Sequence, residues 1–93
     1  MAAITYASDA NNLSATANVM ARAGMVTGVW VSSASGSPTI AIYDSATTGT
    51  DTIIANTFTP VAGTYYPIPF AVAAGVYVVI GGTVDCTVGT IPG

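Results

Sequence analysis

The chain has 93 residues, of which 52% are hydrophobic and only 5% are charged, and its formal net charge is −3. Lysine, glutamate, glutamine and histidine are absent, which excludes a histidine-dependent catalytic triad, a lysine Schiff base and a His/Cys zinc site. The one basic residue, Arg22, is too little positive charge for a surface that binds nucleic acid or anionic lipid.

Residues 1–23 are rich in alanine, asparagine and serine, and their large apolar side chains show no period of two. Leu13, Ala17 and Met20 have the spacing of a short helical stripe, but an isolated helix of this length is marginal. The segment is therefore predicted to be an arm, extended or partly ordered, that needs a partner to hold it. The alternative is a first β-strand near residues 16–20 that packs into the domain itself.

From Gly24 onward the pattern is that of short strands separated by turns. Alternation, β-branched residues and turn residues together predict strands at 25–33, 39–45, 52–58, 64–72, 76–82 and 83–88. In the first of these, Trp30 is predicted to share a face with Val26, and both faces carry apolar groups, as in a central strand of two packed sheets. Pro67 and Pro69 stand two residues apart, which favours an edge strand.

Short strands at this spacing, without a helical pattern, predict an all-β fold. We expect a compact antiparallel β-sandwich or small barrel of six to seven short strands over residues 24–93, with the N-terminal arm over residues 1–23. The longest apolar stretch, residues 67–82, is shorter than the ~20 residues that span a bilayer and contains two prolines. No membrane association is expected.

The carboxylates and the cysteine are the candidates for a chemical site. Asp44, Asp51 and Asp85 could converge on calcium, but dedicated calcium sites cluster their acids in one loop. Asp44 and Asp51 are more simply turn residues that bond their own backbone. Cys86 lies at an apolar position, where a small buried side chain is expected. We therefore expect no enzymatic activity, no metal and no cofactor.

The aromatic residues offer a different kind of site. A platform for stacking on sugars could be formed by Trp30, Tyr43, Tyr65, Tyr66 and Tyr77. However, Trp30 lies in a strand with two apolar faces, where a core tryptophan belongs. The adjacent Tyr65 and Tyr66 equally suit a subunit contact. Core or interface roles are therefore favoured over a ligand site.

The surface composition favours contact with other proteins. Its polar residues are mostly threonine, serine and asparagine, which lose water at lower cost than charged side chains. We infer that protein covers much of this surface. Arg22, just before the domain, is suited to a bidentate pair with a partner's carboxylate.

Three stretches carry a family resemblance: TIAIYD at 39–44, YYPIPF at 65–70 and GVYVVIGGT at 75–83. With these, residues 24–90 resemble the small virion proteins of tailed bacteriophages, in particular the cement or decoration proteins on capsids of the HK97-like type. The resemblance implies a β-sandwich or barrel body, binding as dimers or trimers across capsomer boundaries, and a terminal arm.

We therefore expect a structural virion protein on the capsid exterior. It would be a cement or decoration protein that binds the outer surface of the phage head and stabilises contacts between major capsid protein subunits. Its partners would be the major capsid protein and itself, as a homodimer or homotrimer. The alternative is a carbohydrate-binding or fibre-type adhesion β-sandwich module. The candidate interface residues are Ile4, Tyr6, Leu13, Val19 and Met20 as anchors of the arm, with Arg22, Tyr65 and Tyr66 as further contacts.

Overall fold

The computed structural model describes residues 8–93, which form six β-strands and no helix. The strands are β1 (Asp9–Leu13), β2 (Ala17–Met20), β3 (Gly24–Asp44), β4 (Ile53–Phe58), β5 (Thr64–Val72) and β6 (Val76–Pro92). All of them belong to one sheet, and every strand pair is antiparallel. The prediction of an all-β antiparallel fold is confirmed. Over residues 8–93 there is no helix of the length and hydropathy that a membrane crossing needs.

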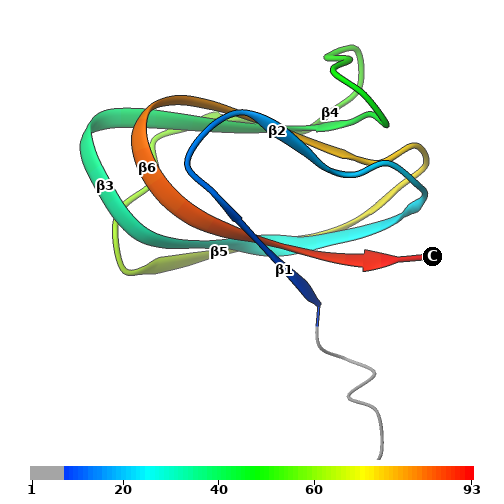
Figure 1. Cartoon of the computed structure of the whole chain (residues 1–93), viewed down its shortest axis with the longest axis horizontal. Coiled ribbons are helices and arrows are strands. Elements are labelled where there is room, and N and C mark those ends of the chain that lie inside the picture. The colour runs from blue at the N-terminus through cyan, green and yellow to red at the C-terminus, as the bar shows by residue number, and fades with distance from the viewer. Residues whose placement is uncertain (1–7) are drawn as a thin grey trace, which may run out of the picture.

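The two long strands, β3 and β6, form the centre of the sheet. They pair from Gly24 opposite Pro92 at one end to Asp44 opposite Val76 at the other. Between these ends the sheet folds back on itself, as Figure 1 shows for both strands. At the bend the β3–β6 pairing is interrupted: it stops at Ser35, opposite Thr83, and resumes at Thr39, opposite Gly81.

Two glycines make this bend. Gly36 in β3 has φ 71° and Gly82 in β6 has φ 79°, in the left-handed region that other residues rarely adopt. The turn predicted at 34–38 is therefore present, but it is a corner within one strand and does not separate two strands. The same holds for the predicted break between 76–82 and 83–88, which lie in β6.

The folded sheet has two layers. The first layer consists of β1, the C-terminal half of β6, the N-terminal half of β3, and β5. The second layer consists of β2, the N-terminal half of β6, the C-terminal half of β3, and β4. The described molecule measures 40 × 34 × 17 Å, so it is a thin β-sandwich made from one sheet.

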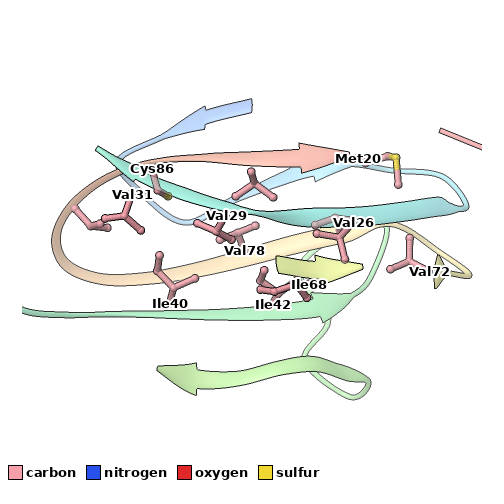
Figure 2. Packing of buried hydrophobic residues seen from close by; sticks show 13 residues of the cluster. Met20, Val26, Val29, Val31, Ile40, Ile42, Ile68, Val72, Val78 and Cys86 are labelled. Atoms are coloured by element: carbon pink, nitrogen blue, oxygen red, sulfur yellow. The ribbon is translucent and has the colours of Figure 1, made fainter. Parts of the chain in front are cut away.

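The core lies between the two layers, and Figure 2 shows its side chains there. Val31 and Cys86 lie near the bend, whereas Met20 and Val72 lie toward the opposite end (Figure 2). Both halves of β3 and of β6 contribute to the core, together with β2 and β5. The buried cluster is Met20, Val26, Val29, Val31, Ile40, Ile42, Ile68, Val72, Val76, Val78, Val84, Cys86 and Val88.

Residues 9–20 are part of this sandwich, so the prediction of an arm over 1–23 does not hold for them. β1 pairs with β6 in unbroken register, and β2 pairs with the other half of β6. Met20 is 6% exposed and belongs to the core, and the partly buried Leu13 and Val19 pack against the core cluster. The alternative of a packed strand near 16–20 is the one observed. This segment forms a strand because β6, far away in the sequence, supplies its backbone hydrogen-bond partners, and the local sequence gives no sign of that pairing. Ile4 and Tyr6 lie outside the described residues.

Trp30 faces solvent, contrary to the prediction of a core tryptophan. The pairing of β3 with β6 shifts by one residue between Val26 and Gly28, so the strand carries an extra residue at this bulge. As a result Val26, Val29 and Val31 all point inward, with no exposure. Trp30 is 44% exposed. A one-residue shift exchanges the two faces of a strand, and simple alternation cannot reveal it.

Candidate docking surface

Most of the exposed large apolar side chains belong to the edge strands β4 and β5 and the turn between them. In residues 8–93 they are Trp30, Ile53, Val61, Tyr65 and Phe70. Four of these five belong to the segment 53–72, which contains β4, β5 and the turn between them, and the fifth, Trp30, pairs with Tyr65. The segment has no charged residue. We call this segment together with Trp30 the β4–β5 side.

Tyr65 is held in place on the outer face of the first layer. Its hydroxyl donates a hydrogen bond to the carbonyl oxygen of Thr27, at 3.1 Å. The end of the ring lies over Gly28, where a Cβ would collide with it and with the carbonyl oxygen of Tyr66. Tyr65 is nevertheless 53% exposed, so the ring is fixed against the strand while water still reaches it.

Tyr66 has an internal role. Its ring packs against Phe58 from the second layer, with ring centroids 4.9 Å apart. Its hydroxyl accepts a hydrogen bond from the backbone N–H of Val61, at 2.9 Å. Tyr66 therefore ties the turn between β4 and β5 to both layers, and of the adjacent tyrosines only Tyr65 is available to a partner.

The edges of the β4–β5 side are poorly suited to strand addition. β5 pairs only with β3 and is an edge strand, as predicted, and its Pro67 and Pro69 are exposed and lack donors. β4 pairs with β3 at three positions, with register shifts between Ile40 and Ile42 and again before Tyr43. Bulges and prolines both protect sheet edges from pairing with another chain. A partner would therefore contact side chains on this side and would not pair with the backbone of an edge strand.

Asp44 is a charged group that forms hydrogen bonds within the fold. Asp44 accepts hydrogen bonds from the backbone N–H groups of Ala73, Ala74 and Gly75, at 2.9, 2.8 and 3.2 Å. Asp44 thus binds the turn between β5 and β6, and the expectation that it bonds its own loop is wrong. Burial raises the pKa of Asp44, but these three donors outweigh burial and hold the pKa below its ordinary value.

The three aspartates considered for a calcium site do not come together in the described structure. Asp85 accepts a hydrogen bond from Asn12 at 2.7 Å on the first layer, away from the Asp44 turn. Among residues 8–93, no three His, Cys, Asp or Glu side chains come together as a metal site would require. Nor does this part of the chain contain a pocket. A ligand or partner of the described residues would therefore bind to an open face of the sandwich.

Cys86 is a buried thiol, as predicted. It is fully buried in the core, and burial raises its pKa, with a further contribution from the negative charge of Asp85. Because the thiolate is the reactive form, the native protein is expected to react with iodoacetamide on the order of 10³-fold more slowly than the protein in guanidinium chloride. Mass spectrometry of timed samples measures this ratio. Equal rates in the two conditions would contradict the described packing.

The candidate interface residues of the sequence do not form one surface. Leu13, Val19, Met20 and Tyr66 pack within the sandwich, and Ile4 and Tyr6 are not described. Arg22 is exposed and donates to the carbonyl oxygen of Gly93 at 3.1 Å. Tyr65 alone lies on the β4–β5 side with its ring exposed. The sequence reasoning missed Ile53, Val61 and Phe70, although all three lie in the longest stretch of the chain without a charge, residues 52–84.

Comparison with protein-family models, curated proteins and solved structures finds no match to this chain.

Proposed function

We propose that this chain is a structural virion protein, a cement or decoration protein that binds the outer surface of a tailed-phage head. It would stabilise contacts between major capsid protein subunits from the capsid exterior. The observation that supports this best is the β4–β5 side, where the exposed large apolar residues gather in a segment without charge. Depletion of charge with aromatic residues at the centre is typical of protein interfaces.

The exposed residues of the β4–β5 side would form the central part of such a contact. A standard interface buries about 800 Å² on each partner and involves roughly 20–30 residues a side. Thirteen residues of the β4–β5 side are exposed, and the chain exposes 5001 Å² in all. One such contact would therefore cover about one sixth of the surface. Association of the chain with itself, as a homodimer or homotrimer, would multiply the contacts with the shell and raise the avidity.

A binding assay with undecorated heads tests the proposal. Purified protein is mixed with a panel of undecorated tailed-phage heads, and bound protein is quantified after sedimentation. Placing charges on the β4–β5 side with Val61→Asp and Phe70→Asp together is expected to weaken uptake at least about tenfold. The reason is that both carboxylates would have to lose water against an apolar partner.

A matched control separates this effect from charge alone. Ala10→Asp with Ala21→Asp adds the same two charges at exposed positions on the opposite, β1–β2 side of the sandwich. This control is expected to bind heads as the parent chain does, with circular dichroism showing that both variants are folded. Equal uptake by the two double variants, or no uptake of the parent chain by any head, would refute the proposal.

A carbohydrate-binding or adhesion module is the second candidate, and one observation favours it. Trp30 is 44% exposed, and it lies directly opposite Tyr65 in the β3–β5 register. Exposed aromatic rings beside polar groups are the usual means by which proteins hold sugars.

A further inference from the structure

Trp30 and Tyr65 place two aromatic rings next to each other on the outer face of the first layer. They are direct partners in the β3–β5 register, and the Cβ atoms of such partners lie about 4.5–5.5 Å apart. The aromatic ring pairs formed within residues 8–93 involve other residues, so neither ring is stacked on another. Both rings therefore keep area for a ligand.

Tyr65 is held in place before any ligand binds, and Trp30 stands on a rigid part of the backbone. The Tyr65 hydroxyl is bonded to the Thr27 carbonyl, and its ring lies over Gly28, so it has little freedom to lose. Trp30 stands on β3, at the centre of the sheet with paired strands on both sides. Side chains that are already fixed cost less entropy on binding.

Polar groups lie beside the rings on the same face. Thr87 of β6 is the register partner of Trp30 on its other side. The amide of Asn12 donates to the carboxylate of Asp85 at 2.7 Å and to the Thr87 hydroxyl at 3.5 Å. These groups retain acceptor lone pairs that suit the hydroxyl groups of a sugar whose ring stacks on Trp30.

The exposed area of this pair by itself is smaller than a protein contact requires. Large aromatic side chains offer about 150–250 Å² each, so two that are about half exposed present about 200 Å². A protein partner centred on this pair alone would need about 800 Å². Since the face has no pocket within the described part of the chain, it suits a polymer that lies along the surface.

The charge of the protein selects among sugars. The net charge is −3, and Asp85 places a carboxylate on this face. Arg22, the one cation, is held at the chain end by Gly93. Uronic and sialic acids would therefore be repelled. We propose that Trp30 and Tyr65 form a stacking site for neutral glycans, an inference that rests on the carbohydrate-binding candidate and is independent of attachment to a phage head.

Affinity electrophoresis with soluble polysaccharides tests this site. The full chain is run through gels that contain galactomannan, xyloglucan or mixed-linkage β-glucan, and through gels that contain alginate or polygalacturonate. We expect at least one neutral polysaccharide to retard the protein and the two acidic ones to leave its mobility unchanged. Trp30 is the one tryptophan of the chain, so its fluorescence should shift during titration with the retarding polysaccharide.

Three variants locate the binding. Trp30→Ala is expected to weaken binding about tenfold, and Tyr65→Phe about threefold because its ring loses the anchor to Thr27. Tyr77→Ala is the matched control, since Tyr77 pairs with Tyr43 on the second layer. Circular dichroism confirms the fold of each variant.

The outcomes separate this site from attachment to phage heads. Retardation that is lost in Trp30→Ala supports the site whether or not the protein binds heads. Retardation by none of the neutral polysaccharides, equal binding by Trp30→Ala, or preference for the acidic polysaccharides would overturn it. Uptake by undecorated heads, measured separately with Val61→Asp and Phe70→Asp, decides the other proposal.

Discussion

Gly75→Ala is expected to destabilise the protein by about 3 kcal/mol, one of the largest effects of a single methyl group in this fold. Gly75 lies in the turn where the chain crosses from β5 in the first layer to β6 in the second. A Cβ at this position would collide with the carbonyl oxygen of Met20 and lie 2.6 Å from that of Ser45. Both are backbone atoms at strand ends, so they cannot move aside as a flexible side chain would.

The effect can be measured as a lower melting temperature. For a domain of this size, 3 kcal/mol corresponds to a decrease of at least about 10 °C in Tm by circular dichroism. Gly49→Ala is the matched control, since its Cβ would have as nearest neighbour the Ser45 hydroxyl, at 3.1 Å, in an exposed loop. A Gly75→Ala protein that melts with the parent chain would show that the crossover is not packed this closely.

The same crossover illustrates what the sequence can and cannot predict. Local patterns predict the class of fold, the edge role of Pro67 and Pro69, and the burial of Cys86. These depend on residues one or two positions apart. Partnership between distant segments depends on the whole fold, and no local pattern shows that Asp44 will bind the turn at 73–75.

Two structural features explain the main differences between the predicted and the observed fold. The sequence places Gly36 in a turn but Gly82 at the end of a strand, and only their alignment across the β3–β6 ladder makes them a shared corner. Trp30 was assigned to the wrong face because one bulged residue before it exchanges inside and outside. That single shift also bears on the candidate site, since it brings Trp30 to the surface beside Tyr65.

Asp44→Asn is expected to lower the free energy of unfolding by about 1–2 kcal/mol at neutral pH. The carboxylate holds three backbone N–H groups of the β5–β6 turn, and two of these bonds are exposed, which reduces their value. The amide keeps one acceptor oxygen, loses the charge and places an NH₂ group against backbone donors. Urea denaturation followed by circular dichroism measures the loss.

The pH dependence of that loss identifies its origin. Burial raises the pKa of Asp44 and the three donors lower it further than burial raises it, so the native carboxyl ionises below its ordinary pKa. The stabilisation is therefore complete above about pH 4, the usual aspartate value, and is lost as the pH falls through the lower native pKa. The stability difference between the parent chain and Asp44→Asn should accordingly shrink in acid.

Asp51→Asn serves as the control for charge, because it removes one carboxylate from an exposed position in the loop that follows β3. If Asp44 acts through the turn, Asp51→Asn keeps the stability of the parent chain at neutral pH and its decline in acid. A stability difference for Asp44→Asn that stays constant down to low pH would instead mean that the amide perturbs packing. The carboxylate would then contribute no charge-dependent bond between the end of β3 and the crossover that joins the two layers.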